Sequence, residues 1–534
     1  MAKVAQGFLP LNWEVIEQSS DLARLRMVLR GLDDEELMQA LEKERKQRRD
    51  DYPVRVCWNC LLAGRVLQHA KVAGLLRELG RNPSLRQVVG MDPHKGEKAV
   101  PTKDAMSRFT QKLLKPEHAQ RVEAVVQGLQ ERLRQRLPDL GRHLAVDATA
   151  LRTWARGRRD PAQSTDPEAG WGKKTRRWKD KEGQVHEEVT KWFGYKLFLL
   201  VDTRYEIPLE WSLHPAHVSD NQPVEELLEG LKKKHPEMKV ETLAGDKAFD
   251  DGPLIRRIHE GFGIRAVFAL RDTAQDGEDG EALPGARNIL LGKDGLVYCY
   301  HQEGAQILRQ PMVYWGFDQG RTCQKWRCPA AVSGQTCAER AACSPTPYGR
   351  SVRVKCQTDW RRFGPMPHGT VQRRQRYNGR TAVERVNSRL KTGLTLDDLH
   401  VRGQARIGLR TNLALIVLLA MAQGHLENKA KAWRSLTRLA RSTEPLPTGT
   451  RRTRQSMNAG EQSTPPPPRS HVSRPGPTLV QRPPQLSLSS PAPFNTPISR
   501  QAFAGLNDPH SPQVQLVPRR RSYDSIDDVL RAER

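Results

Sequence analysis

Four polar residues of different chemistry recur at helical spacing near position 384 of this 534-residue chain. They are Tyr377, Arg380, Glu384 and Lys391. At 100° per residue they fall within about 60° of one another around a helix axis, so one continuous helix would gather them in a stripe. A carboxylate beside a guanidinium, an ammonium and a phenol suits a divalent cation next to a phosphodiester. The alternative is a solvated helix face with an i,i+4 Arg–Glu pair.

Two further carboxylates follow short apolar segments that are typical of buried strands. Asp147 closes the segment 143–147, and Asp246 closes the segment 242–246. Together with Glu384 they would form a hard, oxygen-rich site suited to Mg²⁺ or Mn²⁺. Two such ions ~4 Å apart can promote an in-line phosphoryl displacement without a protein nucleophile. The alternative role for either aspartate is a strand-end cap or an ion-pair partner.

The spacing Tyr-x2-Arg-x3-Glu-x6-Lys resembles the signature around the third acidic residue of bacterial insertion-sequence transposases of the DDE class. Asp246 opens the Asp-x-x-aromatic-Asp motif of the same family, with Phe249 where a tyrosine is common. This departure leaves the carboxylates in place. The resemblance covers most of residues 1–425.

The resemblance implies that Asp147, Asp246 and Glu384 are catalytic metal ligands on an RNase H-like domain. Arg380 and Lys391 would hold phosphates of the transposon end, with Tyr377 supporting them. The expected activity is metal-dependent cleavage at insertion-sequence ends and strand transfer into target DNA. The expected partners are the terminal inverted repeats, target DNA and further copies of the chain in a homo-oligomeric active complex.

Two other functions stay open at this point. One is an RNase H-like nuclease or resolvase that cuts without strand transfer. The other is a non-catalytic DNA-binding protein derived from a transposase. Among rival acidic residues, Asp202 ends a strand antiparallel to the first and should lie at the opposite sheet edge. Asp220, Asp250 and Asp251 are expected in turns.

The order of apolar segments predicts an α/β fold. We expect an RNase H-like mixed sheet with flanking helices, preceded by an all-α domain and followed by a disordered tail. The expected divisions are a helical DNA-end-binding domain, the first part of the catalytic domain, a partly cysteine-rich insertion, the closing helices, and a basic Pro-rich tail. Their ranges are 1–140, 141–270, 271–375, 376–440 and 441–534.

Two short helices in the N-terminal region suit either a helix-turn-helix or plain bundle packing. Ser84 to Gln87 has the form of a capping box, and Pro101-Thr102 begins a helix that carries Arg108. This region also resembles the N-terminal domain of the same transposases, which favours DNA-end binding through residues such as Arg108.

Residues 151–190 interleave basic and aromatic side chains and are expected to form a loop on DNA. Basic groups neutralise phosphates, and aromatic rings stack on unpaired bases. The alternative is a solvated loop whose tryptophans pack locally. The candidate contacts are Arg158, Arg159, Lys173, Lys174, Arg176 and Arg177, with Trp154, Trp171 and Trp178 between them.

Four cysteines of the insertion, Cys323, Cys328, Cys337 and Cys343, are spaced x4, x8 and x5. Four thiolates in a small polar segment are able to hold a structural Zn²⁺ in place of a hydrophobic core. Only the first spacing is usual for zinc, so a reduced, loosely packed insertion is the alternative. Cys57 and Cys60 are expected to be buried core thiols.

The formal net charge of +26 indicates a polyanionic partner, nucleic acid before an anionic membrane surface. The longest apolar run, 413–422, is too short to span a bilayer and predicts a buried helix. No secretory signal is evident at the N-terminus. We therefore expect a cytoplasmic, nucleoid-associated protein with no membrane partner.

Overall fold

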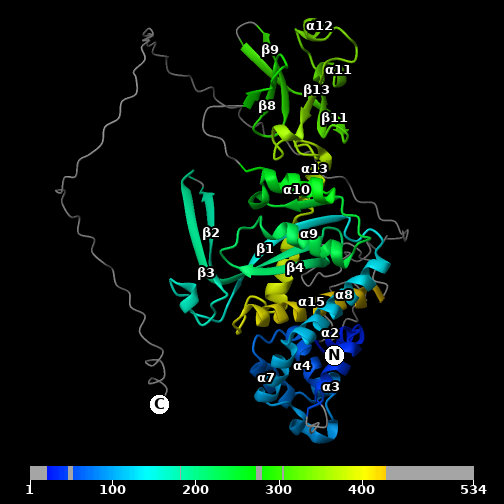
Figure 1. The fold of residues 1–534 in the computed structure, drawn as a ribbon, viewed down its shortest axis with the longest axis vertical. Helices are drawn as coiled ribbons and strands as arrows, with labels where there is room; N and C mark the ends of the chain where they lie inside the picture. Colours follow the sequence, from blue (N-terminus) through cyan, green and yellow to red (C-terminus); the bar gives the residue numbers. More distant parts are fainter. Residues whose placement is uncertain (1–20, 46–51, 181, 272–279, 304–305, 428–534) are drawn as a thin grey trace, which may run out of the picture. The chain divides into compact units, whose positions relative to one another are not determined.

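The computed structural model describes residues 21–45, 52–180, 182–271, 280–303 and 306–427 (Figure 1). All of them belong to one unit, Met1–Thr450. The predicted tail, 441–534, lies outside the described residues.

The described part of the chain before position 137 is helical. Thr102 caps one helix by accepting a hydrogen bond from the Ala105 amide at 3.2 Å, as its sequence predicts. The cap of the short helix before it is Asn82, which accepts from the Leu85 amide at 3.0 Å, so the capping box expected at Ser84 is wrong. The elements are α2 (Asp21–Arg30), α3 (Glu35–Arg45), α4 (Val54–Val66), α5 (Val72–Arg81), α6 (Pro83–Val89), η1 (Pro93–Ala99), α7 (Lys103–Leu113) and α8 (Pro116–Arg136).

A mixed sheet follows, in the order β2-β3-β1-β5-β6 with β4 also paired to β3. The first strand, β1, is antiparallel to β3 and parallel to β5. The order of the apolar segments predicts that the strands before Asp147 and Asp246 lie side by side and parallel, and the pairing of β1 with β5 confirms this. The strands are β1 (His143–Arg152), β2 (Gly170–Lys179), β3 (Val185–Asp202), β4 (Pro208–Pro215), β5 (Thr242–Gly245) and β6 (Arg265–Phe268), with helices α9 (Pro223–Lys234) and α10 (Gly252–Phe262) between them.

The segment 151–190 is largely a β-hairpin rather than the expected loop. β2 pairs with β3 from Gly170 opposite Gly194 to Lys179 opposite Val185, and Figure 1 shows the hairpin standing out from the sheet. Gly194 also faces Arg152 of β1, and a Cβ there would lie 2.2 Å from the Leu151 carbonyl. With φ at 153°, this position needs glycine where the long strand changes partner. The ladder hydrogen bonds available to a 18-residue strand explain why the polar segment is extended.

The insertion contains two small sheets and has its own core, formed by Ile289, Leu291, Val297, Trp326 and Phe363 among others. One sheet has the order β10-β9-β8-β7 and the other β11-β12-β13. Their bounds are β7 (Gly280–Ala282), β8 (Ile289–Gly292), β9 (Val297–Glu303), β10 (Gln306–Pro311), β11 (Val313–Asp318), β12 (Cys323–Arg327) and β13 (Ser351–Lys355), with α11 (Pro329–Val332) and α12 (Arg340–Cys343) before β13.

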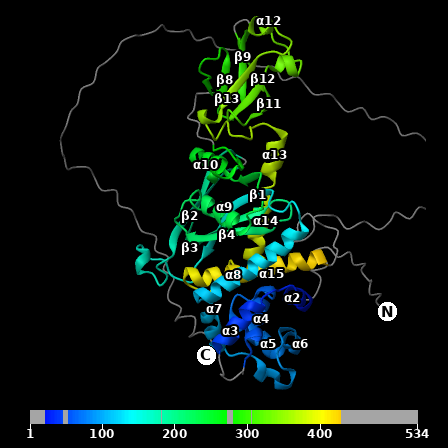
Figure 2. The same ribbon diagram turned by 45° about the vertical axis from the view of Figure 1, so that its right-hand side comes forward.

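The chain then returns to the sheet through α13 (Val371–Asn378), α14 (Thr381–Ser388) and the π-helix η5 (Arg389–Gly393). The last described helix, α15 (Gln404–Glu427), packs on β4 and on α2, α4 and α8 (Figure 2). It is long and apolar enough to cross a membrane, but 78% of its most apolar window is buried within the protein. The prediction of a buried helix at 413–422 is confirmed.

Candidate active site

Asp147 lies in the middle of β1, not at its end as expected, because β1 continues beside β3 as far as Arg152. The parallel pairing with β5, however, stops at Ala145. Asp246 directly follows β5 and caps the 3₁₀ helix η3 (Lys247–Phe249), its Oδ1 accepting from the Ala248 amide at 2.7 Å. Both aspartates therefore lie just beyond the C-terminal end of the parallel pairing between β1 and β5.

Glu384 comes from α14, whose buried residues Ala382, Val383 and Val386 face β1 and β3. The helix is joined to the first aspartate directly, because Asn387 Nδ2 donates a hydrogen bond to Asp147 Oδ2 at 3.0 Å. The Glu384 side chain lies one turn earlier and is 48% exposed. Packing and this single hydrogen bond thus hold α14, the helix that carries Glu384, against the strand of Asp147.

Electrostatics shows that the three acidic residues share one site. The pKa of Asp147 is raised from 3.8 to about 6, first by burial and then by the negative charge of Asp246. Glu384 raises this pKa further, while the Ala148 amide and the Arg380 guanidinium lower it. Neighbouring like charges have this effect because they disfavour the ionised carboxylate.

The predicted stripe is only partly assembled. Tyr377 lies in the last turn of α13 and Glu384 belongs to α14, because i→i+3 hydrogen bonds at Gly379 and Arg380 interrupt the α-helical pattern. Arg380 still lies over the Tyr377 ring at 5.6 Å and pairs with Glu384 Oε1 at 2.6 Å. Lys391, displaced by the π-helix, pairs with Asp397 at 2.9 Å instead. The prediction of one continuous α-helix from Tyr377 to Lys391 is wrong.

The acidic oxygens of the site do not all lie within 4.8 Å of one another. Among the described residues, the only cluster that meets this criterion is Glu44, Glu117 and His118. There, His118 Nε2 lies 2.6 Å from Glu44 Oε2, and Lys115 Nζ lies 3.0 Å from Glu44 Oε1. Because the Lys115 ammonium already pairs with Glu44, this cluster is an ion-pair network between α3 and α8.

Rival acidic residues are engaged elsewhere. Asp202 is buried and accepts from the amides of Gly141, Arg204 and Tyr205 at 2.7–2.9 Å. Its carboxylate therefore stabilises the turn after β3. Asp202 pairs with Leu144, near the start of β1, so it lies toward the opposite sheet edge from Asp147, as expected.

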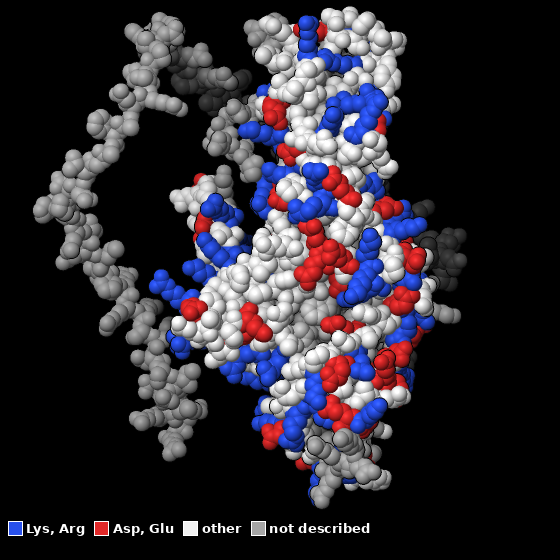
Figure 3. All heavy atoms as spheres, viewed as in Figure 1, with Lys and Arg blue, Asp and Glu red and all other residues white. Residues whose placement is uncertain are grey.

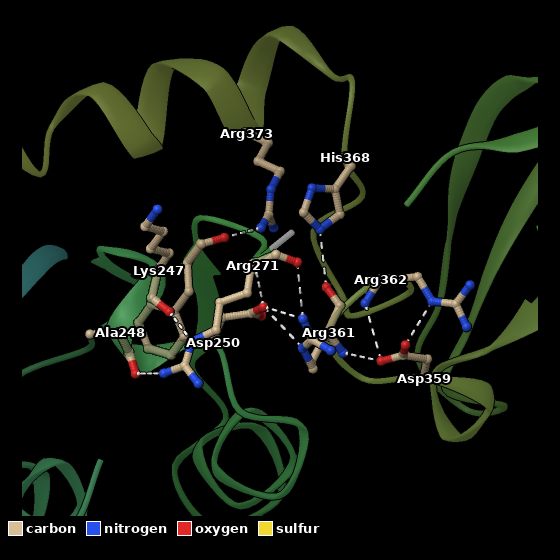
Figure 4. Close-up of polar contacts among 10 residues, drawn as sticks. Lys247, Ala248, Asp250, Arg271, Asp359, Arg361, Arg362, His368 and Arg373 are labelled. Carbon is tan, nitrogen blue, oxygen red and sulfur yellow. Dashed lines mark hydrogen bonds and ion pairs between the residues drawn. The ribbon is translucent and has the colours of Figure 1, made fainter. Parts of the chain in front are cut away.

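Asp250, four residues after Asp246, is also committed to structure (Figure 4). Its Oδ2 accepts from Arg361 Nε at 2.9 Å and from the Arg271 amide at 2.7 Å. Asp251 caps α10 through the Leu254 amide. Asp220 pairs with Lys196 at 2.7 Å. None of these four aspartates replaces a member of the predicted triad.

Three residues of the site were missed by sequence reasoning. Asn387 lies three positions after Glu384, about 60° away around a helix, so the helical wheel was the available signal. Arg385 and Arg389 both pair with Glu206, which follows β3, and so anchor the helix to the sheet. No local pattern in the sequence indicates that long-range contact.

The basic hairpin exposes most of its predicted contacts. Lys173, Lys174, Arg176 and Arg177 lie exposed on β2, and Figure 3 shows Lys and Arg side chains along this hairpin. Arg177 pairs with Glu187 at 2.6 Å, but Lys173 faces Lys191 directly across the ladder. Like charges in that position destabilise a strand pair, so a bound polyanion would relieve the repulsion.

The aromatic and basic residues before β2 are also at the surface. Arg158 and Arg159 are exposed, and the Arg158 carbonyl accepts from Trp171 Nε1 at 2.8 Å. Trp154 and Trp171 are 59% and 43% exposed, enough to offer ring faces to a ligand. Arg108 is exposed on α7 and makes no ion pair with any other described residue.

The four predicted zinc ligands do not come together as a set. Cys323 and Cys328 stand at opposite ends of β12, and five residues of extended strand span roughly 16 Å. Cys323 instead lies near Cys356, and both are buried. The structure therefore excludes Cys323 from a site shared with Cys328, because strand geometry separates them. As expected, Cys57 and Cys60 are buried in α4.

Comparisons with known proteins identify the family. Residues 138–420 match the family described as the transposase DDE domain. No curated protein matches the chain. Among solved structures, the chain is similar to a piggyBac transposase in a synaptic complex with hairpin DNA, with a TM-score of 0.32 and 12% identity over 78% of each chain. Because the family match spans more than half of the sequence, from before β1 into α15, this protein belongs to the DDE transposases, which cleave DNA and transfer its strands with the help of divalent metal ions.

Proposed function

We propose that Asp147, Asp246 and Glu384 are the metal ligands of this transposase. The observation that carries the proposal is that the parallel pairing of β1 with β5 and the contact of α14 with β1 bring these elements together, and the raised pKa of Asp147, to which both other carboxylates contribute, supports it. The three residues come from β1, from the end of β5 and from α14, and no packing requirement explains why three acidic side chains should converge there. Such convergence is costly unless a cation or a proton offsets it.

The donor set fits a hard divalent cation, Mg²⁺ or Mn²⁺, because all three side chains supply carboxylate oxygens. When bound, such ions would activate the attacking oxygen and stabilise the leaving oxygen of a phosphodiester. Asn387 would hold Asp147 in a fixed orientation through its 3.0 Å hydrogen bond. This support matters because ligand orientation sets metal affinity.

Arg380 has a second role in this proposal. Its ion pair with Glu384, at 2.6 Å, holds the glutamate to its own helix. For Glu384 to join the aspartates, the guanidinium must release it, and a DNA phosphate is a suitable new partner for the freed cation. Tyr377, beneath the guanidinium, would keep it aimed at the backbone. Lys391 would contribute a phosphate contact only after leaving Asp397.

The sheet order supports an RNase H-like interpretation of the catalytic part, with the insertion entering after β6 and α14 closing the site. We place the transposon end along the edge carrying Asp147 and Asp246. The basic hairpin would extend the contact, together with Arg158 and Arg159, and Arg108 of α7 would contact the terminal repeat. A homo-oligomer acting at the nucleoid, on the two ends of an insertion sequence, is part of the same proposal.

The test is a cleavage and joining assay with end DNA and a labelled target. Asp147→Asn, Asp246→Asn and Glu384→Gln should each retain DNA binding and lose cleavage by several orders of magnitude, since an amide is a poor metal ligand. Asp251→Asn is the matched control, because asparagine caps a helix as well as aspartate does. It should cleave at close to the wild-type rate.

The outcomes separate the possible functions. Cleavage without joining by the wild type would make the protein a nuclease or resolvase. Binding without cleavage under Mg²⁺ and Mn²⁺ would leave a DNA-binding derivative. Near-normal cleavage by any one triad variant would remove that residue from the metal site.

A further inference from the structure

A second group of cysteines meets in the insertion, different from the set suggested by sequence spacing. Cys299 of β9, Cys328 at the start of α11, Cys337 and Cys343 line one small, partly open cavity of about 20 Å³. That volume holds roughly one water-sized particle or one ion. Burial is the largest cause that raises the pKa of Cys299 to about 11, and the thiols of Cys328, Cys337 and Cys343 contribute to the same shift. The shared lining therefore places the four cysteines around one small space.

The backbone is arranged to bring these thiols together. Cys328 donates its amide to the Arg350 carbonyl at 2.8 Å, which fixes the end of β12 to the start of β13. Gly349, with φ at +75°, turns so tightly that a Cβ would lie 2.4 Å from Ala331 and 3.1 Å from the Cβ of Cys328. Gln310 Nε2 donates to the Thr336 carbonyl at 2.8 Å and so holds the segment before Cys337 against β10.

The segment that supplies two of the thiols has almost no apolar contacts of its own. From Ser333 to Tyr348, all of it described, no side chain is buried. Within this stretch only Cys337, Cys343 and Ser344 are partly covered. A polar segment of this kind gains little stability from the hydrophobic effect, so its fixed position requires another source of stabilisation.

Two nitrogen donors lie close to the last cysteine. Arg350 Nη1 and Asn288 Nδ2 lie 3.7 and 3.8 Å from Cys343 Sγ, and Arg350 also donates to Asn288. Donors to a ligand sulfur are the usual second layer of a metal site.

We propose that Cys299, Cys328, Cys337 and Cys343 bind one structural Zn²⁺ that fastens the 333–348 segment to β9. Zinc bound to four sulfurs at 2.3 Å places them about 3.8 Å apart. No three of these four sulfurs lie within 4.8 Å of one another here, so binding would draw them together. Cys323 and Cys356 take no part, because they lie together at the other end of the β12–β13 pair.

Zinc content of the full-length protein, purified without chelators, tests this directly. Wild type should contain about one zinc per chain, and Cys337→Ser and Cys343→Ser should lose most of it. Cys323→Ala and Cys356→Ala are matched controls that should keep it, as should Asp147→Asn, which excludes zinc at the catalytic carboxylates. Absence of zinc from the wild type, or its loss only from the Cys323 and Cys356 variants, would overturn the proposal.

A measurement on the wild type avoids variants that fail to fold. Replacing zinc with Co²⁺ should give the intense near-ultraviolet absorption of sulfur-to-cobalt charge transfer. Adding a chelator should then expose Cys337 and Cys343 to alkylation while Cys323 and Cys356 stay protected, as mapped by mass spectrometry. Equal alkylation of Cys337 and Cys343 with and without chelator would contradict a site formed by these thiols.

Discussion

At the scale of single residues, the site depends on groups that hold the carboxylates as much as on the carboxylates themselves. Asp147 is half-buried and is repelled by two neighbouring carboxylates, yet Asn387 of α14 holds it by a hydrogen bond. An amide donor is well suited to this task, because it orients a carboxylate without adding charge that would compete with a metal ion.

We therefore predict that Asn387→Ala lowers cleavage about 10–100-fold and raises the metal concentration needed for half-maximal rate. Metal titrations of the cleavage rate measure both effects. Ser388→Ala, an exposed neighbour on α14, is the control and should behave as wild type. Equal metal requirements in both variants would mean that the hydrogen bond has no role in metal binding.

His368 provides a pH-dependent prediction. Burial and then the charge of Arg373 lower its pKa to about 4, and its Nε2 donates to the Arg361 carbonyl at 3.0 Å (Figure 4). Histidine in the unfolded chain has a pKa of about 6.5, so between pH 6.5 and 4 this residue is protonated in the unfolded chain but neutral in the folded chain. This histidine thus contributes stability above pH 6.5 that is lost as the pH falls toward 4.

The expected loss is about 1–3 kcal/mol between pH 7 and 4.5. His368→Gln keeps a hydrogen-bond donor but cannot titrate, so its unfolding midpoint in urea should change less over this range. Because other groups titrate in both proteins, the difference between the two is the relevant quantity. Parallel pH profiles would show that His368 is protonated in the folded state as well.

At the scale of elements, the hairpin formed by β2 and β3 is a charged arm built on the strand that neighbours Asp147. Lys173 and Lys174 make no ion pair within the described residues, and Lys173 faces Lys191. A bound polyanion such as DNA would neutralise these opposed like charges and so stabilise the strand pair.

Lys173→Ala combined with Lys174→Ala should weaken DNA binding uniformly across sequences and reduce the slope of log K against log salt by about 1–2. Lys232→Ala with Lys233→Ala on α9 makes the same change in charge at another exposed place and should leave the slope nearly unchanged. Fluorescence anisotropy at several salt concentrations measures both. Indistinguishable slopes would remove the hairpin from the DNA interface.

At the scale of the whole molecule, α15 connects parts that are distant in sequence. It contacts β4 as well as α2, α4 and α8, within one continuous hydrophobic core. Arg65 of α4 adds a buried hydrogen bond to Thr395 Oγ1 at 2.5 Å. The N-terminal helices therefore cover an apolar helix of the catalytic part in addition to any contact with DNA.

Two deletions should consequently behave differently. Removing residues 1–140 would expose the apolar face of α15 and should give aggregated protein. Removing residues 445–534, whose Pro-rich basic composition predicts no packed core, should leave cleavage of end DNA within about tenfold. Size-exclusion chromatography and the cleavage assay check these outcomes. A soluble, folded product of the first deletion would show that α15 does not need that cover.

The sequence alone indicated the three candidate carboxylates and a mixed α/β fold for the part of the chain that carries them. Asp147, Asp246 and Glu384 sit in local patterns, since apolar strands, an acidic residue after each and a helical spacing are short-range signals. The adjacency of β1 and β5 followed from the order of the elements.

Only the tertiary structure decided which distant groups meet. Asn387 reaches Asp147, Arg385 and Arg389 reach Glu206, and the thiol of Cys299 joins Cys337 and Cys343 while Cys323 does not. These pairings depend on strand register, helix breaks and turns that place residues far apart in the chain within a few ångströms. Cys323 and Cys328 are close in sequence, but the extended strand β12 lies between them and keeps them apart in space. Spacing along the sequence does not predict such distances.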